Sequence, residues 1–384
     1  MTRRHAHPSA EGEPHGPWED EAHHDEEMPR IQVTRRSLVL GFVSVAAIVA
    51  FLYFVVPTLG DVEDGLGRIR DGDPWWLALA VAFSVLSFVG YVATFKGVYV
   101  PADDRAARRI GFSESYQITM ASLAATRLFA AGGAGGVALT AWALRRAGMP
   151  PRTVADRTIA FLVLTYAVYM LALIVAGFGL RFDLFEGPAP IGLTVVPAVV
   201  GAVALALALL LTFLPADLEG RFAGWATGHG RVARIAARLS TVPAAVGSGM
   251  RAALAHVRRR DPALAGALGY WGFNIAILWA CFHAFGEPPP PAVIVMAYYV
   301  VLLGNLLPLP GGVGGVDGDM IGALAGFGVD LGLATVAVLA YRIVAFWLPT
   351  IPGAIAYLQL RRTVHRWREE RAAERTGSFQ AVEA

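Results

Sequence analysis

Long apolar stretches constrain this chain more than any other feature of its sequence. Six of them run for 20 residues or more with at most one charged residue, at 38–57, 75–95, 158–180, 191–213, 264–286 and 333–358. A helix rises about 1.5 Å per residue, so about 20 residues cross the hydrocarbon core of a bilayer. The pattern predicts an all-α polytopic membrane protein with six full transmembrane helices.

Composition excludes other classes of protein. Charged residues make up 16% of the 384, against roughly 25% in a typical soluble domain. The 32 Lys and Arg nearly balance the 30 Asp and Glu, which excludes nucleic-acid binding through bulk positive charge. Cys281 is the sole cysteine, so neither an intramolecular disulfide nor a cysteine-based metal site is expected.

The distribution of basic residues predicts the orientation. With six spans, 25 of the 32 Lys and Arg residues fall on one side of the membrane and three on the other; the remaining four lie in the far N-terminal tail or at membrane depth. The positive-inside rule makes the first side cytoplasmic. Both termini are then cytoplasmic and the protein lies in the cell membrane, with no cleavable signal peptide.

The predicted parts are a disordered tail at 1–34, a membrane domain at 35–362 containing a basic loop at 214–263, and a tail at 363–384. Five histidines among acidic residues make a weak metal site in the first tail conceivable, but its composition favours disorder.

Two further apolar stretches, 112–147 and 292–330, do not cross in this arrangement. Glycines interrupt each at its centre, at 132–136 and 311–315. We predict two re-entrant helical hairpins, one from each face of the membrane. The alternative, in which every arm spans, needs helices of about 14–16 residues, short of the roughly 17 that a span requires.

The two glycine segments also form an internal repeat. Residues 122–137 and 301–316 align with seven identities in sixteen, including the whole GG-x-GGV core. Because the hairpins open to opposite faces, the repeat is inverted, as in many secondary transporters. Half-helix N-termini at such turns present free N–H groups that suit an anion. Alternatively, the glycines serve only tight turns and close helix packing.

Ionisable residues at membrane depth are costly and call for a partner or a role. Arg127 precedes the first glycine turn, Asp317 follows the second, and Arg342 lies within the last span. One hypothesis is an anion site in which both arginines bind phosphate and Asp317 pairs with Arg342 when the site is empty. The alternative is an Arg342–Asp317 pair that only fixes helix packing. Taken singly, Asn305, Asn274 and His283 are better explained as interhelical hydrogen-bonding residues than as ligands.

Specific motifs carry a family resemblance. The run Asn305–Gly318, then Ala340-Tyr341-Arg342, Phe346–Pro349 and Gly353, resembles the C-terminal signature of the flippase-like domain, the membrane region of lysylphosphatidylglycerol synthetases. Residues 126–136 and 144–148 are similar to that family's first motif, and the resemblance covers about residues 38–362. The substrate-binding residues expected on these grounds are Arg127, Gly132, Gly133, Gly135, Gly136, Asn305, Pro310, Gly311, Gly312, Gly314, Gly315, Asp317, Tyr341 and Arg342.

Two departures from the family pattern matter. Asp317 stands where the family commonly has Glu, and Thr126 and uncharged residues 137–140 replace an Asn and an acidic residue of the first motif. In that family, lysyl transfer belongs to a separate soluble domain, and only 22 residues follow Arg362 here. We therefore expect neither a synthetase nor any other enzyme, and no cofactor or metal.

The predicted function is movement of an anionic phospholipid or a lipid-linked precursor between leaflets without ATP. Membrane lipids are the expected partners, and nucleic acid is not. The alternatives are a secondary transporter of a small solute or ion, and a non-transporting subunit that recruits a glycosyltransferase or a lipid-modifying enzyme.

Overall fold

The computed structural model describes residues 72–101, 109–128, 134–213, 247–259, 261–306 and 315–383. Every regular element in these ranges is a helix, which confirms the all-α prediction for this part of the chain. The predicted first span at 38–57, the N-terminal tail and most of the basic loop lie outside the described residues.

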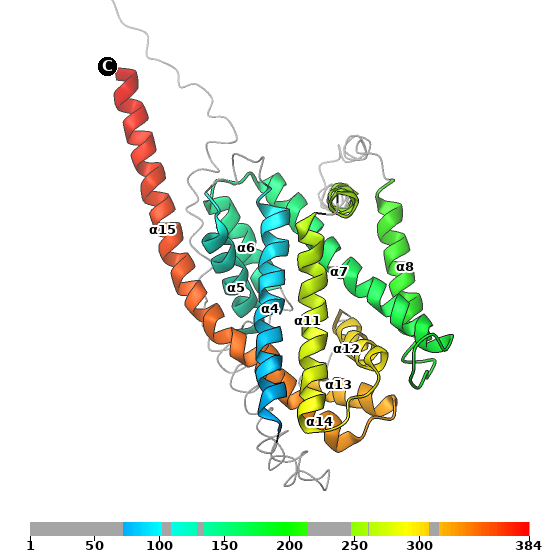
Figure 1. Ribbon diagram of the computed structural model, residues 1–384. Helices are drawn as coiled ribbons and strands as arrows, with labels where there is room; N and C mark the ends of the chain where they lie inside the picture. The colour runs from blue at the N-terminus through cyan, green and yellow to red at the C-terminus, as the bar shows by residue number, and fades with distance from the viewer. Residues whose placement is uncertain are drawn as a thin grey trace, which may run out of the picture. The chain divides into compact units, whose positions relative to one another are not determined.

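Among the described residues, four helical runs are long and apolar enough to cross a membrane (Figure 1). They are α4 (Pro74–Tyr99), α7 (Pro151–Arg181), α11 (Pro262–Phe285) and the run Leu331–Glu370. The last run joins α14 (Leu331–Arg342), η4 (Ile343–Trp347) and part of α15 (Leu348–Glu383). The span predicted at 191–213 forms α8 (Val195–Leu211), an apolar helix of 17 residues at the lower limit for crossing. The six-span count thus stays a prediction.

Each glycine-interrupted stretch forms two helices that pack on each other. The first contains α5 (Phe112–Leu128) and α6 (Ala134–Arg146), and the second contains α12 (Pro291–Leu306) and α13 (Gly315–Gly326). These helices have 17, 13, 16 and 12 residues, which corresponds to about 18–25 Å each. Over the residues described, all four are shorter than the roughly 30 Å of a hydrocarbon core, and the re-entrant arrangement stays a prediction.

The open ends of the two hairpins lie at opposite ends of α4. At its C-terminal end, Lys96 lies over the ring of Phe112 at the start of α5. Arg157 there bonds both the carbonyl of Tyr99 and the sulfur of Met149, just after α6. At the other end of α4, the N–H of Asp73 donates to the carbonyl of Ala284 near the end of α11. Helix α11 ends six residues before α12 begins. With 26 residues, α4 separates these ends by about 39 Å.

Aspartate and proline define where several helices begin. The carboxylate of Asp73 accepts the N–H of Trp75 at 2.9 Å, and Pro74 is the first residue of α4. Asp261 and Pro262 begin α11 in the same way, and Asp330 caps α14 through the N–H of Leu333. An N-cap side chain satisfies an otherwise free N–H, and proline costs nothing where the N–H has no helical partner. These pairs fix the start of both α4 and α11.

Helices α4 and α11 pack closely where both carry small residues. A Cβ atom added to Gly266 would lie 2.6 Å from the Gly90 carbonyl oxygen and 2.8 Å from the Thr94 nitrogen. One added to Gly97 would lie 2.7 Å from the Cβ of Ala263. Small residues at such a crossing let two backbones approach closely, which is the main source of helix association in lipid.

A side chain at Gly266 should therefore destabilise the protein. We expect Gly266→Val to force α4 and α11 apart and to cost about 1–3 kcal/mol, as overpacking of a filled contact does. Gly272→Val on the same helix is the matched control, because nothing lies within 4 Å of a Cβ added there. The measurement is the thermal midpoint in detergent, followed with a dye that reacts with the buried thiol of Cys281 as it becomes exposed. Equal midpoints for the two variants would contradict the packing assigned to α4 and α11.

Candidate functional site around Arg342

Arg342 ends α14 and lies at the centre of the best-defined part of the predicted site. Its side chain is half-buried, and its guanidinium carbon lies 4.2 Å from the centroid of the Phe346 ring. This is the distance of a cation–π contact, which stabilises a cation without neutralising its charge. The preceding Tyr341 is buried, and its hydroxyl group donates to the hydroxyl oxygen of Tyr298 on α12 at 3.1 Å. The second hairpin is thus tied to the residue before Arg342.

Aromatic side chains from α7, α11 and α12 cluster around the Tyr341–Tyr298 hydrogen bond. Tyr298 and Tyr299 of α12 pack with Trp271 of α11, and the Tyr169 ring of α7 stacks near Tyr299 at 4.9 Å. The hydroxyl of Tyr169 donates to the backbone oxygen of Tyr299, and the indole N–H of Trp271 donates to the backbone oxygen of Thr165. Because the polar tips of Tyr169 and Trp271 both have acceptors, the cluster joins α7 to α12 and to α11.

The helix widens into a π-turn directly after Arg342. Over Ile343–Trp347 the N–H of Leu348 donates to the oxygen of Ile343, five residues back instead of four. Pro349 follows at once, and it has no N–H to donate to either Val344 or Ala345. Both properties of proline favour the π-turn: Pro349 lacks an N–H, and in an ordinary α-helix its ring would clash with the carbonyl of Ala345. Such π-turns occur frequently at functional sites.

The carbonyl that the π-turn releases is satisfied from another helix. Ser84 of α4, which is 2% exposed, donates its hydroxyl hydrogen to the oxygen of Val344 at 3.1 Å. This bond also gives the depth of the turn. Ser84 comes ten residues after Pro74, about 15 Å along α4, so the π-turn packs near the middle of that helix.

The glycine turns are only partly described. Gly132, Gly133, Pro310, Gly311, Gly312 and Gly314 lie outside the described residues. The backbones of Arg127, Asn305 and Asp317 lie in α5, α12 and α13, but their side chains are not described. Convergence of Arg127 and Asp317 on Arg342 thus stays a prediction. Gly315 already lies in α13 where the description of the chain resumes, so the start of that helix at the second turn stays a prediction.

In the first hairpin, Gly136 serves packing. A Cβ added there would lie 2.6 Å from the Ser122 carbonyl oxygen of α5 and would also meet the Thr126 hydroxyl. Beside it, the hydroxyls of Ser122 and Thr140 are 2.8 Å apart and join the two arms. Gly135, one residue earlier, is half-buried. Gly136 thus takes part in close packing of the two arms, and its expected role in binding stays a prediction.

The two other polar residues at depth make structural contacts. The amide nitrogen of Asn274 donates to the hydroxyl of Ser87 on α4 at 2.6 Å and to the carbonyl of Tyr270 at 2.8 Å, as an interhelical role predicts. The ring of His283 stacks on Trp76 with their centroids 4.2 Å apart, and Trp279 packs edge-on against it.

Sequence reasoning missed Ser84, Phe346 and Pro349 as parts of the site. Pro349 carried a usable signal, because a proline within a predicted span requires a local change in the helix or a kink. Ser84 carried none, since it lies 260 residues from its acceptor and resembles any other small polar residue in a membrane helix.

Comparison with known proteins gives the family. Residues 39–353 match the model for the lysylphosphatidylglycerol synthase TM region. The chain belongs to this family. It is also 25% identical over 340 residues to a UPF0104 membrane protein of Methanothermobacter thermautotrophicus, covering 84% of this chain and 94% of that protein. The family match includes both glycine segments, Arg127 and Arg342, and ends early in α15. The family resemblance identified from the motifs is confirmed. The chain is a multi-pass membrane protein, and its family is consistent with a lipid-related role in the membrane.

The bond between Ser84 and the π-turn yields a prediction. Ser84→Ala should leave the Val344 carbonyl without its donor in an apolar environment and cost about 1–3 kcal/mol. In a Pro349→Ala background, which restores an N–H to the helix, the same change should cost much less. The measurement is the thermal midpoint of the wild type, the two single variants and the double variant. Ser113→Ala, which removes an exposed hydroxyl on α5, is the control. Additive shifts would show that the proline does not create the need for Ser84.

Proposed function

We propose that this protein moves an anionic phospholipid or a lipid-linked precursor between leaflets without ATP. The observation that carries the proposal is a half-buried arginine at a π-turn that packs near the middle of a spanning helix. An arginine at the centre of a membrane helix costs at least about 2.5–3.5 kcal/mol. A binding role for an anion explains why such a residue is kept there.

The chemistry of Arg342 suits a lipid phosphate. A guanidinium binds phosphate oxygens in a two-pronged geometry and keeps its charge at any physiological pH. Its stacking on Phe346 holds the planar group in one orientation. If α13 begins at the second glycine turn, its N-terminus would add backbone N–H groups and a partial positive charge on the second hairpin. The other arm of that hairpin bonds Tyr341. In the proposed cycle, Asp317 pairs with Arg342 when no lipid is bound.

The arrangement of the hairpins suggests how access alternates. Their open ends are separated by the length of α4, so each would enter the membrane from its own face. Movement of one hairpin at a time would expose the headgroup site to one leaflet and then to the other, as in transporters built from inverted repeats. We place the protein in the cell membrane with both termini cytoplasmic. No covalent step, cofactor or metal enters the proposal.

Exchange of lipids in proteoliposomes tests the role of Arg342. Wild-type protein should let a quencher confined to the outside reach more than half of a fluorescent phosphatidylglycerol probe. Arg342→Ala should lower the exchange rate at least about tenfold, because the phosphate loses its charged partner, and Arg342→Lys should retain part of it. Arg181→Ala, at an exposed arginine ending α7, is the control and should be unchanged.

The same experiment separates the competing functions. Wild-type exchange in a folded Arg342→Ala variant would remove the basis of the proposed site. A wild-type protein with no exchange above protein-free vesicles would contradict lipid movement altogether, and would favour solute transport or a recruiting subunit.

A further inference from the structure

The last helix continues well past its apolar part and has two distinct faces. One face is buried along its length, at Gly353, Ala356, Leu360, Val364 and Trp367. These positions are three or four residues apart, the spacing of a single helical stripe. The opposite face is exposed. The helix is therefore held to the protein by one side and presents the other side to its surroundings.

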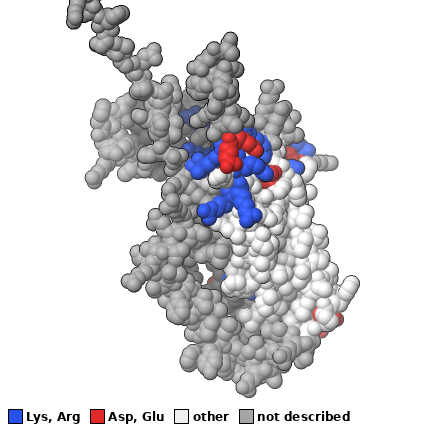
Figure 2. Space-filling view, turned by 90° about the vertical axis from the view of Figure 1, so that its left-hand side faces the viewer, with Lys and Arg blue, Asp and Glu red and all other residues white. Residues whose placement is uncertain are grey.

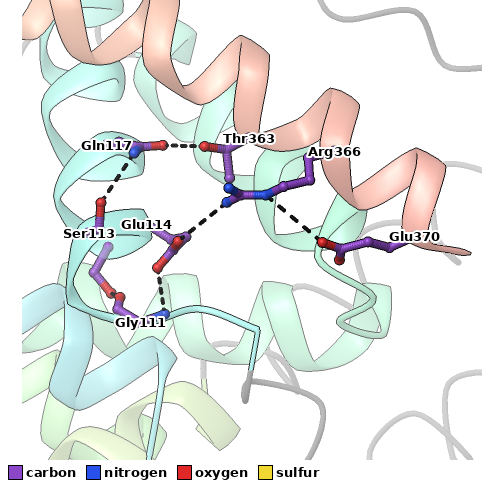
Figure 3. Close-up of polar contacts among 8 residues, drawn as sticks. Gly111, Ser113, Glu114, Gln117, Thr363, Arg366 and Glu370 are labelled. Atoms are coloured by element: carbon purple, nitrogen blue, oxygen red, sulfur yellow. Dashed lines mark hydrogen bonds and ion pairs between the residues drawn. The ribbon is translucent and has the colours of Figure 1, made fainter.

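Contacts with α5 hold the buried face (Figure 3). A Cβ added to Gly353 would lie 2.9 Å from that of Ala124, so the backbones of α5 and α15 approach closely there. Nearer the end of α15, the hydroxyl of Thr363 donates to the side-chain oxygen of Gln117 at 2.8 Å. Arg366 then lies 3.8 Å from Glu114. The rotation of α15 about its axis is thus fixed at three levels.

The exposed face changes character within one helical turn. Ile351, Ile355 and Leu358 are more than half exposed and suit contact with acyl chains. Arg361 and Arg362 continue the same side of the helix, three and four residues beyond Leu358. In Figure 2 basic side chains, with acidic ones among them, gather directly beside a broad surface without charges. Such a transition is expected at the boundary between hydrocarbon and water.

The basic residues on this stretch differ in their partners. Arg366 lies near Glu114 and Glu370, and His365 near Glu369. In the part of the chain that the structure describes, no ion pair is found for Arg361, Arg362 or Arg368, and all three are exposed. We call these three residues the basic face of α15.

We propose that the basic face binds the headgroups of anionic phospholipids in the leaflet on its own side of the membrane. Two observations select lipid as the partner. Arg361 and Arg362 lie about one turn beyond exposed apolar side chains, which is where phosphates lie relative to acyl chains. The α5 contacts also keep the basic face turned outward, toward the surrounding leaflet. The surface lies 19 residues beyond Arg342, about 28 Å along the helix, so it is separate from the proposed transport site.

Energy transfer to labelled lipids tests the proposal on the full chain. A fluorophore on Leu358→Cys reports the lipids beside the basic face, since the native Cys281 is buried. Vesicles of phosphatidylcholine with a minor fraction of phosphatidylglycerol receive a trace of acceptor-labelled lipid of either headgroup. We expect transfer to favour phosphatidylglycerol. Arg361→Gln with Arg362→Gln should reduce this preference at least about twofold, because each arginine near an anionic surface contributes up to about fivefold in partitioning.

A second arginine pair provides the matched control. Arg258 and Arg259 are adjacent and exposed at the end of the helix before α11, and changing both to Gln removes the same charge. This control should keep the preference, whereas high salt should weaken it by screening. Equal transfer to both lipids in the wild type would overturn the proposal. So would a preference that survives in the Arg361/Arg362 variant, or one that the control variant also loses.

Discussion

The need to satisfy every backbone polar group without water governs this structure. In hydrocarbon an unpaired carbonyl costs several kcal/mol, so irregular helix is tolerated only where protein supplies the missing donor. The π-turn after Arg342 meets this condition through Ser84, whose hydroxyl bonds the carbonyl that Pro349 leaves without a donor. The site therefore depends on α4 as much as on the helix that carries the arginine.

The α4–α11 pair supports both halves of the protein. Its close contact through Gly90 and Gly266 forms a rigid unit, and Asn274 adds a buried hydrogen bond across it. The first hairpin begins beside one end of α4, and the second follows α11 at the other end. In the proposed mechanism these hairpins move while α4 and α11 stay in place, because close packing and a buried hydrogen bond join those two helices.

Much of the fold could be predicted from the sequence, for identifiable physical reasons. The apolar stretches that became α4, α7 and α11 are long enough to be unambiguous, and Asp-Pro pairs mark where α4 and α11 begin. The glycine runs correctly separated the two arms of each hairpin, since their backbone freedom ends a helix in either context.

The parts that escaped prediction depend on tertiary contacts. The π-turn results from Pro349 together with a donor 260 residues away, and no local pattern identifies that donor. The start of the segment expected to be a tail continues α15, packing on α5 through Thr363 and Arg366 and carrying two pairs four residues apart along the helix. Of the candidate site, the placement of Tyr341 and Arg342 is now described, while the role of the glycine turns remains a proposal.

The central claim is that the two hairpins enter the membrane from opposite faces and that neither crosses it. Single cysteines at Ser113 and Arg145 flank the first hairpin, and others at Glu287 and Leu331 flank the second; all four positions are exposed. Labelling with a membrane-impermeant thiol reagent in vesicles of known orientation tests the claim directly. The first two cysteines should react from the cytoplasmic face and the last two from the opposite face. Reaction of the two cysteines of one hairpin from different faces would show that its arms cross and would exclude the re-entrant arrangement.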